Sequence, residues 1–256
     1  MLGRVLAGIK MNIGSFCRPN RFSGINSNSK VGNKLTKISN NLEEINKKIE
    51  NAKQKANVTQ DVKIIAVTKQ VSTERTIEAL ETGLVHLGEN RPEGLLSKKE
   101  VIQTKAKWHY IGSLQTRKVK QVINELDYLH SLDRMSLAEE IEKRAEQTVN
   151  CFVQANVSGE ESKHGLSKEQ VIPFIQSLHE FKKIRIVGLM TMAPNTEDEA
   201  TIRKVFRDLK QLQQEVVALE LPYAPCNELS MGMSNDYEIA VEEGATFVRI
   251  GTALVG

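Results

Sequence analysis

The stretch VKIIAVTKQ, Val62–Gln70, is an apolar run that ends on a lysine. Its residues 64–67 follow one another with no polar alternation, which is typical of a parallel strand buried on both faces. Helix signals begin at Ser72, so Lys69 lies where this strand passes into a strand-to-helix loop. In parallel sheets and barrels, that end of a strand carries the chemistry. Lys69 is therefore a candidate amine nucleophile for an aldehyde, and the alternative is a lysine that simply extends into water.

Seven more apolar segments follow along the chain, with a helical pattern between neighbouring pairs. They are Val85–Asn90, Lys107–Gly112, Tyr128–Asp133, Cys151–Val157, Ile184–Met192, Glu228–Met233 and Phe247–Gly251. Strands that alternate with helices in this way predict an α/β fold, a single-domain (β/α)8 TIM barrel. An open doubly wound sheet is the competing architecture. It would normally place a glycine-rich phosphate loop after the first strand, and the TKQVS found there is not such a loop.

An amphipathic helix is predicted over Leu35–Asn57, where apolar residues recur at helical spacing. No helix is predicted after the eighth strand, so we expect this N-terminal helix to pack on the barrel and close its outer ring. The barrel domain is placed at residues 35–256. Capping boxes are predicted at three helix starts, where Ser or Thr precedes Glu or Gln by three positions. The pairs are Ser136 with Glu139, Ser167 with Gln170, and Thr196 with Glu199.

Residues 1–34 differ from the rest of the chain because they are basic, rich in Asn, Ser and Gly, and free of acidic residues. Their composition predicts a disordered N-terminal extension. An organellar transit peptide is one alternative. An extended translation start is another, since Met11 is a second candidate initiator.

The composition argues against several classes of function. A net charge of +3 and an aromatic content of 5% do not suit a nucleic-acid surface. Cys17, Cys151 and Cys226 are widely spaced and make no CxxC pair, so we expect a reducing, cytoplasmic location and no metal site. Organellar targeting by residues 1–34 would change that location. No apolar run is long enough to span a bilayer, and we expect no membrane partner.

Two turns after the last two predicted strands suit a phosphate group. SMGMS, Ser230–Ser234, brings two hydroxyls and backbone N–H groups to a strand-to-helix turn, although its last serine could be an ordinary N-cap. RIGT, Arg249–Thr252, follows one strand later, where these barrels usually bind phosphate. Its glycine would let the backbone approach the ligand closely, and its threonine adds a hydroxyl.

Arg249 lies inside an apolar strand, where a guanidinium without a partner is costly, so either a ligand or a structural ion pair must engage it. Glu89 and Asn90 end the second strand, and each is either a site group or a loop-capping residue. A lysine after strand one, combined with phosphate-suited turns after strands seven and eight, predicts pyridoxal phosphate. The aldehyde would then react with Lys69.

Six sequence blocks agree in order and spacing with one known family. They are AVTK (Ala66–Lys69), HLGEN (His86–Asn90), WHYIGSLQTRK (Trp108–Lys118), GLMTM (Gly188–Met192), LSMGMSND (Leu229–Asp236) and VRIGTALVG (Val248–Gly256). They resemble the pyridoxal phosphate homeostasis proteins, the YggS/PROSC-like group, which are similar to the N-terminal barrel domain of alanine racemase. The resemblance covers about Leu35 to Gly256. Thr68 and the RPEG after Asn90 depart from the commoner family pattern.

The resemblance implies a barrel that binds pyridoxal 5'-phosphate, with Lys69 as the Schiff-base residue. It implies a set of cofactor-binding residues, namely Lys69, Asn90, Ser230, Met231, Ser234, Arg249, Gly251 and Thr252. Arg249 resembles the group that faces the pyridine nitrogen. A positive charge there disfavours protonation of that nitrogen and makes the ring a weaker electron sink.

The implied function is intracellular homeostasis of pyridoxal phosphate and amino acids, by a monomer that holds the cofactor and transfers it to other enzymes without robust turnover. Amino acids are expected as further partners. The alternative is a pyridoxal phosphate-dependent amino-acid racemase, completed by a partner subunit or by a tyrosine such as Tyr110. In alanine racemase a second base comes from a separate C-terminal domain. This chain ends four residues after Thr252, so we expect no such base here.

Overall fold

A computed structural model describes residues 37–103, 106–160 and 164–256, which all belong to one compact unit. The strands are β1 (Lys63–Val67), β2 (His86–Glu89), β3 (Lys107–Tyr110), β4 (Tyr128–Leu132), β5 (Val149–Asn156), β6 (Leu166–Ser167), β7 (Ile184–Met190), β8 (Glu228–Met233) and β9 (Phe247–Ile250). The helices are α1 (Lys37–Ala56), α2 (Thr73–Glu81), α3 (Pro92–Val101), α4 (Val119–Val122), α5 (Met135–Arg144), α6 (Lys168–Ser177), α7 (Glu199–Val217), α8 (Tyr237–Glu242) and α9 (Thr252–Val255). Two short 3-10 helices, η1 (Thr116–Lys118) and η2 (Ile123–Glu125), flank α4.

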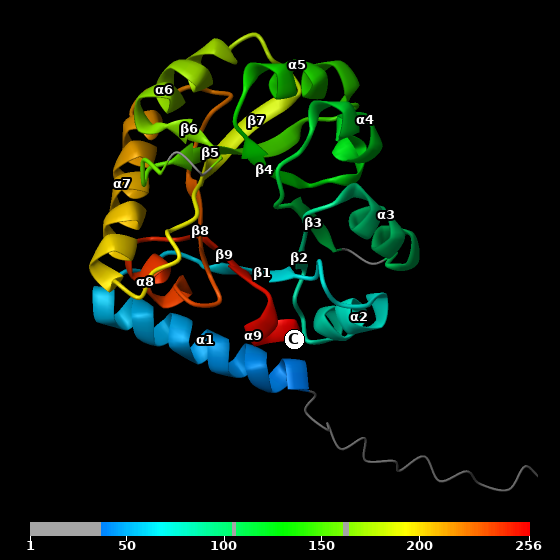
Figure 1. The fold of residues 1–256 in the computed structure, drawn as a ribbon, viewed down its shortest axis with the longest axis vertical. Coiled ribbons are helices and arrows are strands. Elements are labelled where there is room, and N and C mark those ends of the chain that lie inside the picture. The colour runs from blue at the N-terminus through cyan, green and yellow to red at the C-terminus, as the bar shows by residue number, and fades with distance from the viewer. Residues whose placement is uncertain (1–36, 104–105, 161–163) are drawn as a thin grey trace, which may run out of the picture. The chain divides into compact units, whose positions relative to one another are not determined.

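The strands form a closed parallel barrel, which confirms the predicted (β/α)8 fold. Around the ring the order is β1, β2, β3, β4, β5, β7, β8 and β9, and β9 pairs back onto β1. Figure 1 shows these strands as an inner ring with the helices outside it. The two-residue β6 pairs with β5 beside the ring and has no counterpart in the sequence prediction. Closure places the C-terminal ends of all eight barrel strands around one mouth.

The side chains of β1 alternate between two cores. Ile64 and Ala66 belong to the apolar layer between strands and helices, whereas Ile65 packs in a separate cluster with Phe152 and Phe247. That second cluster fills the barrel interior, and the Lys63 ammonium lies 4.8 Å from the Phe247 ring centroid. The interior-facing positions of β1 are therefore 63, 65 and 67. The next position on the same face is 69.

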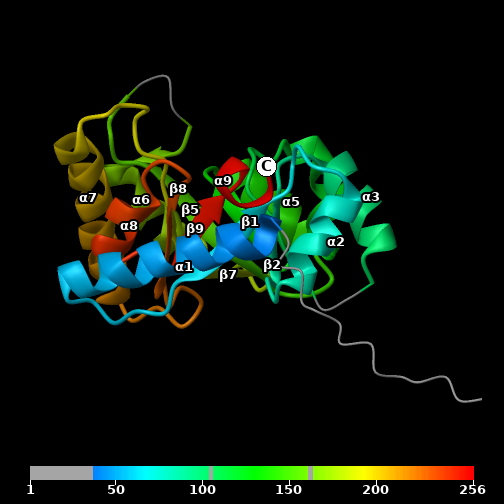
Figure 2. The same cartoon turned by 90° about the horizontal axis from the view of Figure 1, so that it is seen from below.

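Helix α1 packs on the barrel, as the sequence predicts, and lies beside α8 and α9 (Figures 1 and 2). Its apolar face is buried through Ile38, Ile45, Ile49 and Ala52. The prediction that no helix follows the last strand is wrong, because α9 forms one helical turn there. One turn is too short to cover the barrel, and α1 packs beside it against α8, α9 and α2.

The predicted capping box of Ser167 and Gln170 is confirmed at the start of α6. The one predicted at Ser136 is wrong, because α5 begins at Met135 and Arg134, two residues before Ser136, occupies its N-cap position without a side-chain cap. The chain enters this helix almost directly from β4, so the serine already lies inside the first turn.

The capping box predicted at Thr196 is also wrong. Asp198 is the N-cap of α7 and accepts a hydrogen bond from the Ala200 N–H, while the Thr196 hydroxyl accepts from the Asp198 N–H. Aspartate competes well with threonine as an N-cap, so the helix starts at the later residue. At α8 the N-cap position belongs to Asp236 rather than to Ser234.

Residues 1–34 lie outside the described part of the chain, so the interpretation of that segment stays a prediction. Within the described residues, no helix is both long and apolar enough to cross a membrane. The same residues contain no group of three His, Cys, Asp or Glu side chains arranged to hold a metal ion.

Candidate functional site at the mouth of the barrel

A pocket of about 800 Å³ opens at the C-terminal ends of the barrel strands. Its lining comes from the ends of β1, β5, β7, β8 and β9 and from the segments that follow β1, β2, β3, β7, β8 and β9. Of the eight residues predicted to bind the cofactor, the pocket is lined by Lys69, Asn90, Ser234, Arg249, Gly251 and Thr252. The structure thus brings together side chains that are up to 183 positions apart in the sequence, from Lys69 to Thr252.

Ser230 and Met231 do not line this pocket. Both lie inside β8 with no solvent exposure, and the Ser230 hydroxyl accepts a hydrogen bond from Arg249. The structure therefore places Ser230 behind Arg249, where it supports the guanidinium, instead of beside the Ser234 turn.

Lys69 lies in the turn after β1 with an exposed side chain. The protein around this position therefore does not bury the lysine side chain. Within the described residues, no hydrogen bond or ion pair engages its ammonium group. The amine is thus accessible to a ligand in the pocket.

The turn that carries Lys69 is fixed from below by a buried polar network. The Thr68 hydroxyl donates to Glu89 Oε1 at 2.7 Å, and Lys98 Nζ donates to the same oxygen at 2.6 Å. Lys98 also donates to the Thr68 carbonyl. Glu89 and Lys98 are 1% and 6% exposed. Of the two residues that end the second predicted strand, Glu89 is thus a buried partner of Lys98 in α3, and Asn90 lines the pocket.

Arg249 is 6% exposed, and its hydrogen-bond partners among the described residues are all neutral. Its Nη1 donates to Ser230 Oγ at 2.7 Å and its Nη2 donates to the Thr191 carbonyl at 3.0 Å. No described carboxylate lies within ion-pair distance, so the structural ion pair considered for this residue is not formed. Burial lowers the pKa of Arg249 to about 10, and the charge of Asp236 opposes that shift. The guanidinium therefore stays positive at neutral pH and faces the pocket without a counter-ion.

The two turns predicted to suit a phosphate are adjacent. The Gly251 N–H donates to Ser234 Oγ at 3.4 Å, and Thr252 begins α9. A Cβ added at Gly251 would meet Val67 at 3.6 Å, an ordinary contact distance. The glycine is therefore not required by crowding within the chain itself.

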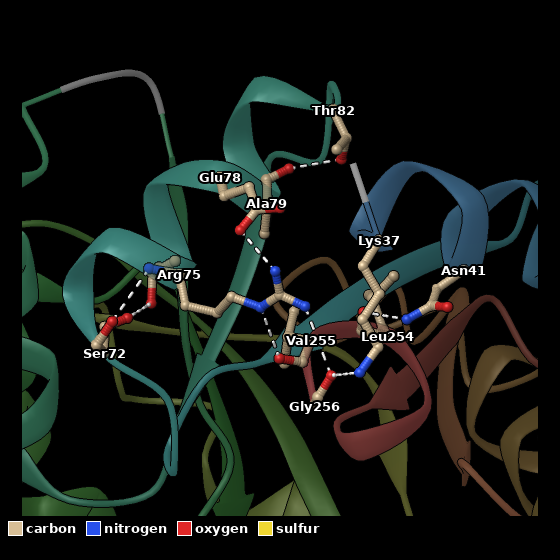
Figure 3. A network of polar contacts seen from close by, with 11 residues as sticks. Lys37, Asn41, Ser72, Arg75, Glu78, Ala79, Thr82, Leu254, Val255 and Gly256 are labelled. Carbon is tan, nitrogen blue, oxygen red and sulfur yellow. Dashed lines mark hydrogen bonds and ion pairs between the residues drawn. The ribbon is translucent and has the colours of Figure 1, made fainter. Parts of the chain in front are cut away.

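Helix α9 is anchored by side chains of α1 and α2 (Figure 3). Lys37 Nζ donates to the Gly256 carbonyl and Asn41 Nδ2 donates to the Leu254 carbonyl, each at 2.9 Å. From α2, Arg75 Nε donates to the Val255 carbonyl at 3.0 Å. These donors satisfy carbonyls that the one-turn helix leaves open. They hold the Gly251–Thr252 turn in place from outside the barrel.

A smaller pocket of about 410 Å³ adjoins the first and shares Asn90 and Ser113 with it. Tyr110, which the sequence suggests as a candidate base, lines this side pocket and not the main one. Burial, followed by the charge of Glu93, raises the pKa of Tyr110 to about 12. At neutral pH the phenol is therefore protonated and cannot accept a proton as a base.

The sequence patterns missed several residues around the site. Lys98 has no motif that separates it from the neighbouring surface lysines of α3. Hydrogen bonds connect His130 to Ser230, His109 to His130 and His86 to His109, and all three histidines belong to strands whose residues individually have the pattern of ordinary core. Only the barrel geometry shows that these side chains support Lys69 and Arg249.

Comparison with known proteins places the chain in a family. The model of the alanine racemase N-terminal domain matches residues 40–256. The pyridoxal phosphate homeostasis protein of Aquifex aeolicus is 40% identical over 201 residues, which cover 76% of this chain and 86% of that protein. The chain belongs to the family of pyridoxal phosphate homeostasis proteins, whose barrel matches the model of the alanine racemase N-terminal domain. The predicted family resemblance is thereby confirmed.

Other relatives agree with this assignment. The pyridoxal phosphate homeostasis protein of Vibrio cholerae is 32% identical over 215 residues, which cover 80% of this chain and 90% of that protein. A structure of PipY from Synechococcus elongatus PCC7942, with PLP (pyridoxal phosphate) bound, superposes with a TM-score of 0.74 at 28% identity. That match covers 86% of this chain and 100% of PipY.

Proposed function

We propose that this chain binds pyridoxal 5'-phosphate in the pocket at the barrel mouth and serves in pyridoxal phosphate homeostasis. One observation carries the proposal. Among the described residues, a lysine whose amine has no partner and a buried arginine without a counter-ion line the same pocket of about 800 Å³ as the Ser234 and Gly251–Thr252 turns. The names and the bound cofactor of the relatives support it.

The residues present fit this cofactor. Ser234 and Thr252 supply hydroxyl donors for a phosphate next to the backbone of Gly251, and Lys69 supplies a primary amine. When bound, pyridoxal phosphate supplies an aldehyde carbon, which would form a Schiff base with Lys69, and a ring that can withdraw electrons. Asn90 would lie beside the ring.

Arg249 would determine whether the ring nitrogen of a bound cofactor carries a proton. Because guanidinium groups only donate hydrogen bonds, Arg249 can approach a ring nitrogen only when that nitrogen carries no proton. Its charge keeps a proton away from that position. This weakens the pull of the ring on electrons and suits a protein that holds and releases the cofactor more than one that breaks bonds to Cα of an amino acid.

The racemase alternative needs a second proton-transferring group opposite Lys69. Tyr110 is poorly suited to that role because it lines the side pocket and is protonated at neutral pH. We therefore propose buffering and delivery of the cofactor, with amino acids as further ligands of the same pocket.

The test is chemical trapping on Lys69. Incubation with pyridoxal phosphate should produce a visible absorbance band, and reduction with borohydride followed by peptide mass mapping should find the adduct on Lys69. The variant Lys69→Arg should lose the band, whereas Lys63→Arg, at the other end of the same strand, should keep it. A colourless wild-type protein, or an adduct on another lysine, would overturn the proposal.

A further inference from the structure

A continuous chain of hydrogen bonds crosses the barrel interior and ends on Arg249. His86 Nδ1 lies 2.9 Å from His109 Nε2, and His109 Nδ1 lies 2.9 Å from His130 Nε2. His130 Nδ1 lies 2.9 Å from Ser230 Oγ, which accepts from Arg249 Nη1 at 2.7 Å. Because these residues come from β2, β3, β4, β8 and β9, the chain runs across the ring and not along one strand.

Aromatic rings hold the two central imidazoles in place. Tyr128 stacks on His109 with ring centroids 4.4 Å apart and planes inclined by 6°. Phe152 stacks on His130 with centroids 4.3 Å apart and planes inclined by 20°. Both histidines are completely buried. The packing leaves each nitrogen directed at its neighbour in the chain.

Arg249 sets the direction of every bond in this chain. A guanidinium has no acceptor, so Ser230 Oγ must accept from Arg249 and its own hydrogen is free to be donated to His130 Nδ1. His130 then carries its proton on Nε2 and donates to His109. By the same rule His109 carries its proton on Nε2 and donates to His86. In the opposite direction, the buried Ser230 hydroxyl hydrogen would have no partner among the described residues, which is costly.

The electrostatics agree with neutral rings. Burial, followed by the charge of Arg249, lowers the pKa of His130 well below its ordinary value. Burial, followed by repulsion from His130 and His86, does the same for His109. At the end of the hydrogen-bond chain farthest from Arg249, burial, followed by the charge of Lys63, lowers the pKa of His86. The further charges that face His86 are Asp127, Lys107 and Asp61.

We propose that Ser230, His130, His109 and His86 form a positioning relay for Arg249, a one-way hydrogen-bond chain in which each histidine is held as the neutral Nε2–H tautomer. The relay orients the guanidinium without neutralising it, because all of its members are uncharged. Arg249 therefore keeps both its charge and its remaining N–H donors for a ligand. The tautomers depend only on the residues of the protein itself. Only the effect on a bound cofactor rests on the proposed function.

The experiment is histidine-selective ¹⁵N NMR of the full chain, in which long-range ¹H–¹⁵N correlations distinguish the two tautomers. The chain has five histidines, and the exposed His164 and His179 provide reference signals. Spectra are recorded before and after addition of pyridoxal phosphate. We expect His109 and His130 to show the Nε2–H pattern at neutral pH in both states. Finding either one charged, or with its proton on Nδ1, would overturn the relay.

Variants of Arg249, at one end of the hydrogen-bond chain, distinguish a relay from simple packing. Arg249→Met removes the donor that sets the direction, so we expect His109, which does not contact Arg249, to lose its single-tautomer pattern. Arg249→Lys keeps a donor-only cation and should retain that pattern. Tyr128→Phe keeps the stacking and should change nothing. An unchanged His109 in Arg249→Met would show that the rings only pack together.

The Ser230 link provides an independent check. Ser230→Ala removes the hydroxyl, whereas Ser230→Thr keeps it, so only the alanine variant should release the His130 tautomer. Failure of the protein to bind added pyridoxal phosphate would refute the proposed function. It would leave the tautomer result intact.

Discussion

Glu89 and Lys98 form a buried ion pair directly beneath the turn that carries Lys69. Each side chain has given up its hydration, so neither charge can be removed without leaving the other unpaired. Both also contact Thr68, the residue before the reactive lysine. The pair therefore connects the stability of the barrel to the position of the amine.

Replacing one partner should be severely destabilising. Lys98→Met leaves the Glu89 carboxylate buried without its cation, and we expect a loss of about 3–5 kcal/mol in the free energy of unfolding. Urea denaturation measures this loss. The matched control is Lys204→Met, which breaks the exposed pair with Asp208 and should cost no more than about 0.5 kcal/mol. Similar costs for the two variants would show that the buried pair is not important to folding.

At the scale of elements, α1 has two functions that its sequence pattern does not separate. Its apolar face completes the layer of helices around the barrel. Its polar edge supplies Lys37 and Asn41, which hold the carbonyls of α9 (Figure 3). A helix that lies before the first barrel strand thus positions the turn that follows the last one.

Asn41→Ala should loosen the Gly251–Thr252 turn while leaving the barrel folded. We expect pyridoxal phosphate to dissociate about five times faster, the equivalent of one lost hydrogen bond of about 1 kcal/mol. Stopped-flow transfer of the cofactor to an acceptor apoenzyme measures this rate. Asn40→Ala, at the neighbouring exposed position of the same helix, is the control and should release the cofactor at the wild-type rate. Equal rates for all three proteins would contradict a role of α1 in the site.

At the scale of the whole molecule, the barrel interior is unusual because it contains neutral histidines among its aromatic side chains. Burial lowers the pKa of His109 and His130 well below 6.5. In the unfolded chain both take up protons below about pH 6.5. Unfolding therefore binds protons in that range, and the free energy of unfolding decreases as the pH falls.

This coupling predicts a steep acid dependence of stability between pH 7.5 and 5.5. Each buried neutral histidine should contribute a slope of about 1.4 kcal/mol per pH unit below about pH 6.5. His109→Gln should remove one such contribution, whatever its effect on stability at pH 7.5. His179→Gln, at an exposed position, should leave the slope unchanged. Denaturant titrations across this range give the slopes, and a wild-type slope in His109→Gln would contradict the assignment.

Local sequence patterns by themselves determined the barrel, the helix α1 and the place of Lys69. A short uninterrupted apolar run is typical of a strand buried on both faces, and the C-terminal ends of the strands lie at the mouth of a parallel barrel. These are short-range properties, since each depends on neighbours within one element. The capping pairs show the limit of such patterns. Ser167 is the N-cap of α6 as predicted, but Asp198 and not Thr196 is the N-cap of α7. The path of the preceding loop determines which of the two residues begins the helix.

Only the tertiary structure decided what lies behind the site. His130 and Ser230 are 100 residues apart in sequence, and closure of the barrel brings His130 Nδ1 to 2.9 Å from Ser230 Oγ. The direction of a strand side chain also depends on the register, which turns Ser230 inward to Arg249 while Ser234 reaches the pocket. Hydrogen bonds between side chains require positions accurate to a few tenths of an ångström. The packed ring of strands supplies that accuracy, whereas no spacing along the chain encodes it.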